Sequence, residues 1–129
     1  MQNKESNTEK RWVFIPVKKT RVLKRTEQYL LLVVDDTITE HNGYIKTFIS
    51  TKFLRSKETE DALFLSLPED MIIRLDVSEK TENGGYRTEN VKNINPWTLR
   101  KLMLGELHAN ELKGWSNELF EKLFGKLPF

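Results

Sequence analysis

A two-residue alternation over residues 43–53, GYIKTFISTKF, restricts the fold of this chain more than any other feature. In a β-strand, successive side chains point to opposite faces. One face here would carry Ile45, Thr47, Ile49, Thr51 and Phe53, and the other Tyr44, Lys46, Phe48, Ser50 and Lys52. The first set suits a core. The second set alternates aromatic rings with lysines, which is unusual for a face that only contacts water and predicts that this face binds a ligand or another surface.

Two earlier segments are predicted to pair with this strand. Residues 28–38 are apolar on both faces at their centre, YLLLVV, which indicates the most buried strand. The Asn-Gly dipeptide in His41-Asn42-Gly43 is typical of a tight hairpin turn, so residues 28–38 and 43–53 should pair antiparallel. Residues 12–25 are rich in β-formers, and we expect one long first strand, bulged or at an edge near Pro16.

Residues 59–67 carry two competing patterns. Thr59-Glu60-Asp61 is typical of a helix start and Pro68 of a helix end. The leucines at positions 63, 65 and 67, however, alternate as in a strand. We favour a short helix, because the acidic residues suit a helix N-terminus.

Two further strands and two helices complete the predicted order. Residues 71–78 alternate cleanly and residues 86–94 more weakly, with a glycine turn between them. Asn95-Pro96 is a typical helix start, and a last helix should run over 117–124 between Ser116 and Gly125. Its apolar stripe is typical of core packing or of a self-association surface and consists of Trp115, Leu119, Leu123 and Phe124.

Length and composition favour one domain with flanking segments. At 129 residues without cysteine, the chain has room for one core and lacks disulfides and thiolate metal ligands. We expect a flexible N-terminus (1–11), a strand-rich domain (12–95) and a C-terminal helical extension (96–129). The polar N-terminus and the absence of a long apolar run predict a cytoplasmic protein without membrane contact.

The sequence offers little for catalysis. His41 and His108 are the only histidines, and they do not have the spacing of metal ligands. Asp35 and Asp36 are adjacent, so on a strand they would point to opposite faces and could not share a metal or a proton. Phosphate-binding glycine motifs and a nucleophile elbow are absent from the sequence. We therefore predict no enzymatic activity, no metal and no cofactor.

Aromatic rings and basic residues together indicate single-stranded nucleic acid as the ligand. Residues 10–25 contain seven basic residues and no acidic one, although the whole chain has a net charge of only +2. Unpaired bases stack on flat rings while cations contact phosphates. The expected stacking residues are Tyr44, Phe48 and Tyr86. The expected phosphate contacts are Lys18, Lys19, Arg21, Lys46, Lys52 and Arg87. Trp12 is either a further stacking platform or a hydrophobe that covers a sheet edge.

The predicted order of three strands, a helix and two strands is that of the five-stranded OB-fold barrel. The segments YLLLVVDDTITEHNGYIKTFISTKF and ALFLSLPEDMIIRLDVSEKTENGGYRTENVKNI, with the ending LPF, resemble single-stranded DNA-binding proteins of bacteria and their phages. The likeness covers roughly residues 12–94. It departs from the family at strand four, where Arg74 or Leu75 stands in place of a glycine. It also departs at the end, where Leu127-Pro128-Phe129 follows Lys126 rather than an acidic tail.

This resemblance implies a protein that coats single-stranded DNA in replication or recombination. It further implies a homo-oligomer that contacts replication or recombination proteins, in the host cytoplasm if the chain is phage-encoded. Two alternatives stay open from the residues alone. The first is a protein-interaction module that uses the aromatic face and the C-terminal stripe, with the C-terminal helices as a possible cover for that face. The second is single-stranded RNA binding, because no residue pattern here identifies recognition of a 2′-hydroxyl.

Overall fold

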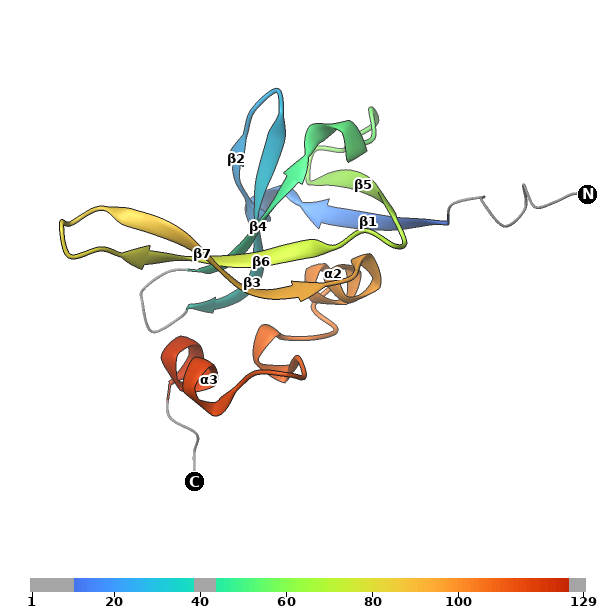
Figure 1. The fold of residues 1–129 in the computed structure, drawn as a ribbon. Helices are drawn as coiled ribbons and strands as arrows, with labels where there is room; N and C mark the ends of the chain where they lie inside the picture. The colour runs from blue at the N-terminus through green and yellow to red at the C-terminus, as the bar shows by residue number, and fades with distance from the viewer. Residues whose placement is uncertain (1–10, 39–43, 126–129) are drawn as a thin grey trace, which may run out of the picture.

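Strands form most of the fold. The structure is a computed structural model that describes residues 11–38 and 44–125. These residues form seven strands and two α-helices (Figure 1), namely β1 (Trp12–Lys18), β2 (Val22–Arg25), β3 (Tyr29–Ile38), β4 (Tyr44–Ser50), β5 (Ala62–Pro68), β6 (Ile73–Lys80), β7 (Tyr86–Ile94), α2 (Pro96–Met103) and α3 (Asn117–Phe124). Three short 3-10 turns are η1 (Lys19–Arg21), η2 (Thr51–Phe53) and η3 (Ala109–Glu111). The predicted mainly-β class is confirmed.

The strands form two antiparallel sheets. One contains β1 and β5, and the other has the order β2-β3-β4-β6-β7. The predicted long first strand is divided at η1, where the backbone N–H of Lys19 donates to the carbonyl of Asp61 at 2.8 Å. As a result β1 pairs with β5, whereas β2 pairs with β3. The strands of the described residues do not close into the five-stranded barrel that we predicted, so that part of the fold prediction is wrong.

The predicted short helix over 59–67 is also wrong, because most of this segment belongs to β5. Leu63, Leu65 and Leu67 point into the core and are fully buried, while the residues between them are only partly buried. The Thr59 hydroxyl accepts from the backbone N–H of Ala62 at 3.0 Å, which closes a turn instead of capping a helix. Burying three leucines on one strand face outweighs a local preference for a helix start.

The hairpin of β3 and β4 is antiparallel as predicted. Its register runs from Tyr29 opposite Ser50 to Val33 opposite Lys46. The predicted turn at His41-Asn42-Gly43 lies outside the described residues. The fourth predicted strand corresponds to β6, and the fifth has the bounds of β7.

The two C-terminal helices form where the sequence predicted them. The Asn95 side chain accepts from the N–H of Thr98 at 2.8 Å, the Ser116 hydroxyl accepts from the N–H of Leu119 at 3.1 Å, and Gly125 ends α3 with φ of 88°. In Figure 1, α3 lies below the strands, whereas α2 lies level with β3 and next to the end of β7. Their buried side chains belong to the same core as those of the strands and are Leu99, Leu102, Met103 and Leu123. The apolar stripe of α3 therefore serves core packing. None of the helices in the described part of the chain is both long and apolar enough to cross a membrane.

Candidate nucleic-acid interface

The outer face of β4 is open to solvent. The Phe48 side chain is 44% exposed and that of Tyr44 is 39% exposed, whereas Ile45 and Ile49 are buried. The predicted alternation along this strand is confirmed. Because the C-terminal helices pack into the core that also contains Ile45 and Ile49, they lie on the inner side of β4 and leave the rings uncovered.

Phe48 has an aromatic neighbour on the adjacent strand. The Tyr29 ring meets it edge to face, with ring centroids 5.5 Å apart and an interplanar angle of 66°. Leu31 lies opposite Phe48 in the register, and Lys24 of β2 lies opposite Leu31. Across the sheet from Phe48, the same face therefore carries Leu31 on β3 and then Lys24 on β2. Tyr29 was not predicted as a site residue, because the apolar run of residues 28–38 indicates a strand buried on both faces.

A basic pocket lies beside Tyr44. It has a volume of about 510 Å³ and is lined by Lys18, Thr20, Arg21, Leu23, Val33 and Tyr44. The Arg21 guanidinium donates to the carbonyl of Val33 at 3.5 Å, which fixes it near the sheet. Three predicted site residues meet here, and none of the lining residues that the structure describes is acidic. The pocket thus joins a ring with two cations, as a stacked nucleotide requires.

Lys46 lies between the two rings and is held against the neighbouring strand β6. Its ammonium donates a short hydrogen bond to the Ser78 hydroxyl, and its partner across the sheet is the buried Asp76. The Asp76 carboxylate also accepts from the amide of Asn90 at 3.2 Å and lies 3.6 Å from the Arg74 guanidinium. Lys46 is consequently a fixed cation with less attraction for phosphate than an isolated lysine.

Lys19 and Arg25 share one acidic partner, Glu58. Its carboxylate oxygens lie 2.8 Å from the Lys19 ammonium and 3.2 Å from the Arg25 guanidinium. These hydrogen bonds, first that from Lys19 and then that from Arg25, lower the pKa of Glu58. A carboxylate that bridges two cations occupies the place where a phosphate would bind, so Glu58 should compete with a nucleic acid for this part of the site.

Glu58→Gln is therefore expected to strengthen binding to an oligonucleotide several-fold at low salt, because two cations lose their internal partner. Glu60→Gln removes the same charge from an exposed position two residues away and should change affinity less. Equal gains in both variants would show a simple net-charge effect. The bridge itself should be intact above the unfolded-state pKa of about 4.5 and should be lost as pH falls through the lowered pKa of the folded state.

In the β6–β7 hairpin, the side chains of Tyr86 and Arg87 point to opposite faces of the sheet. Tyr86 is exposed, and the register places residues 86, 88 and 90 opposite residues 80, 78 and 76, on the face of Lys46. Arg87 points to the other face together with Glu89, whose carboxylate lies 3.5 Å from the Lys122 ammonium on α3. Tyr86 therefore shares a face with the rings of β4, and Arg87 does not.

The last two predicted residues, Trp12 and Lys52, meet at the far end of β4. They line a pocket of about 570 Å³ together with Phe53, Leu54, Arg55 and Ser66. Lys52 follows β4 in η2, and its ammonium lies 5.1 Å from the centroid of the Phe53 ring. A cation and an aromatic ring are thus available at both ends of this strand.

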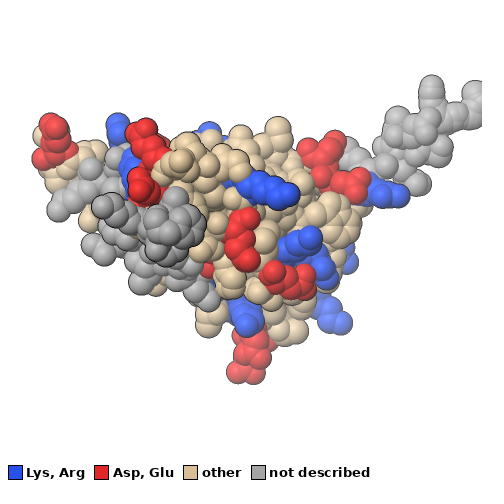
Figure 2. Space-filling view, turned by 90° about the horizontal axis from the view of Figure 1, so that it is seen from below, with Lys and Arg blue, Asp and Glu red and all other residues tan. Residues whose placement is uncertain are grey.

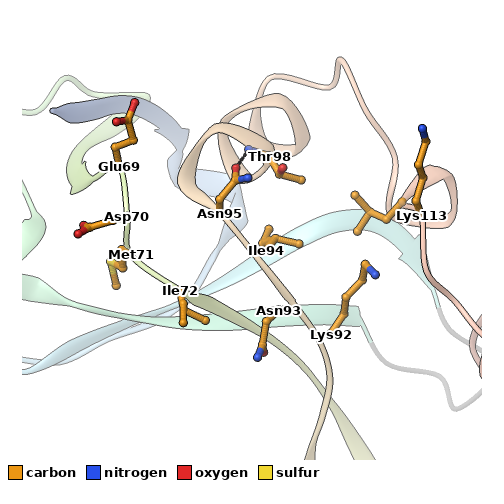
Figure 3. A pocket seen from close by; sticks show the side chains of 11 residues that line it. Glu69, Asp70, Met71, Ile72, Lys92, Asn93, Ile94, Asn95, Thr98 and Lys113 are labelled. Carbon is orange, nitrogen blue, oxygen red and sulfur yellow. Dashed lines mark hydrogen bonds between the residues drawn. The ribbon is translucent and has the colours of Figure 1, made fainter.

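The side of the molecule that carries the helices is different in charge. Viewed from there, Figure 2 shows acidic and basic side chains interspersed. A third pocket, of about 550 Å³, has Glu69 and Asp70 at one end and Lys92 and Lys113 at the other (Figure 3). Its mixed charge offers no continuous path for a polyanion, so we do not include it in the interface.

Comparisons with models of protein families, with curated proteins and with solved structures find no match to this chain. Within the described residues, no group of three or more His, Cys, Asp or Glu side chains is placed to hold a metal ion.

Proposed function

We propose that this protein binds single-stranded DNA without sequence preference, through base stacking on β4 and phosphate contacts from the basic residues around it. The observation that supports this most directly is the pair of exposed rings on one strand face. Tyr44 and Phe48 are four residues apart, or about 13 Å along the strand, which leaves room for separate bases. Cations flank both rings, which is the combination that non-specific single-strand binding needs.

The alternative of a protein-interaction module has less support. It required two surfaces, and one of them, the apolar stripe of α3, packs into the core through Leu123. It also gives no reason for the basic pocket beside Tyr44. The aromatic face alone remains for a protein partner.

The proposal extends to the biological setting that the sequence suggests. We propose that the protein coats single strands during replication or recombination, as a homo-oligomer in the cytoplasm. Sedimentation with and without oligonucleotide would test the oligomeric state.

A binding assay with matched single-stranded and duplex DNA tests the central claim. We expect oligo(dT) to bind more tightly than a duplex of equal length, because paired bases are not available for stacking. Equal affinity for both would mean that only phosphates are contacted, and no binding to either would favour the protein-interaction module. Competition with oligo(U) measures whether RNA binds equally well.

A further inference from the structure

The outward face of the β1–β5 sheet carries a second aromatic cluster. The Trp12 side chain is 54% exposed and that of Phe14 is 49% exposed. The Phe14 ring lies nearly parallel to the Phe64 ring of β5, at 13° with centroids 5.6 Å apart. These rings stand on the face opposite to Val13, Ile15 and Val17, which are buried in the core. They are therefore available to a ligand.

Arg55 holds a cation over this cluster. Its guanidinium lies 5.8 Å from the centroid of the Phe14 ring, and it donates to the Ser66 hydroxyl at 3.3 Å. The ring and the hydroxyl together orient the guanidinium before any ligand arrives, although the side chain is exposed. A guanidinium plane can stack on a base, and its edge can contact a phosphate.

The pocket that Trp12 and Arg55 line begins next to the C-terminal end of β4. Lys52 lines it and lies two residues after Ser50, the last residue of that strand. The backbone N–H of Thr51 donates to the carbonyl of Gln28 at 3.0 Å, which ties η2 to the start of β3. None of the six described residues that line this pocket is acidic, and two of them are cations that attract phosphates.

We propose that the β1–β5 face is a second stacking site for the same DNA strand, reached past Lys52 after the strand leaves Phe48. Trp12 takes a base, while Arg55 and Lys52 hold the adjoining phosphates. The inference rests on the proposed function and adds to it the path of the nucleic acid. Affinity should therefore depend on length, because a short oligonucleotide occupies β4 alone and a longer one reaches both sites.

The test measures the dissociation constants of short and long oligo(dT), of about 4 and about 16 nucleotides. Trp12→Ala and Arg55→Gln should each weaken binding of the long oligonucleotide about 5-fold or more and leave the short one unchanged. Phe48→Ala should weaken both. Trp97→Ala is the matched control, because that indole is 49% exposed on α2, donates to Glu69 at 3.2 Å and lines neither of the two basic pockets. Circular dichroism verifies that each variant is folded.

Two results would overturn the inference without touching the proposed function. One is wild-type affinity of both Trp12→Ala and Arg55→Gln for the long oligonucleotide while Phe48→Ala is weakened. The other is an equal loss for short and long oligonucleotides, which would place Trp12 in the first site. If the wild-type protein binds neither oligonucleotide, the proposed function fails, and the inference fails with it.

Discussion

Phe48→Ala is expected to weaken binding of oligo(dT) by about 1 to 3 kcal/mol, or about 5-fold to 150-fold, because one base loses its stacking platform. The protein should stay folded, since the Phe48 ring is 44% exposed. The cost in stability should be limited to the edge contact with Tyr29, about 0.5 to 1.5 kcal/mol. Fluorescence titration gives the affinity, and thermal unfolding followed by circular dichroism gives the stability.

Two replacements at the same position separate stacking from apolar contact. Phe48→Tyr keeps an aromatic face and should retain affinity, whereas Phe48→Leu keeps apolar bulk and should lose most of it. Leu104→Ala removes an exposed apolar side chain at the end of α2, away from β4, and should have no effect. If Phe48→Leu binds as tightly as the wild type, base stacking on this ring is not the source of affinity.

The sequence predicted the faces of β4 correctly because a strand has a fixed two-residue period. From Tyr44 to Ile49, the side chains predicted to face the core are buried, and those predicted to face outward are exposed or partly exposed. Helix ends were predictable for a similar reason: Asn95 and Ser116 satisfy backbone N–H groups within three residues of themselves. Such local rules need no knowledge of the rest of the chain.

The errors arose where distant contacts decide the structure. The break at η1 depends on a hydrogen bond between Lys19 and Asp61, which are far apart in sequence. Residues 62–67 form a strand because β1 offers a partner whose buried side chains face the same core as Leu63 and Leu65. With β1 and β2 in different sheets, the closed barrel could not form as predicted.

The candidate site was predictable only where local sequence rules place its residues. Tyr44 and Phe48 follow from the period of one strand, and the basic first segment from composition. Tyr29 joins them only through the register of the hairpin, and Arg55 joins Phe14 only because β5 is a strand. Arg87 directly follows Tyr86, so the same two-residue period places their side chains on opposite faces, and only Tyr86 shares the face of Lys46.

The dependence of affinity on salt is the second large expected effect, because each cation that neutralises a phosphate releases a counterion. If four cations around the aromatic face do so, the slope of log affinity against log salt is about −3 for a single strand, which is about 50-fold between about 50 and about 200 mM salt. Those four are Lys18, Arg21, Lys24 and Lys52.

Variants assign this slope to particular side chains. Lys24→Gln should make it shallower by about 0.7, and Glu58→Gln should steepen it by up to about 1.4, since Lys19 and Arg25 then join the contacts. Lys113→Gln, on the side of mixed charge, should leave it unchanged. A slope near zero in the wild type would mean that the rings alone bind the ligand. If Lys113→Gln changes the slope as much as Lys24→Gln does, the phosphates follow another path. The expected pattern instead requires the polyanion to run along β4, where rings and cations lie on one face.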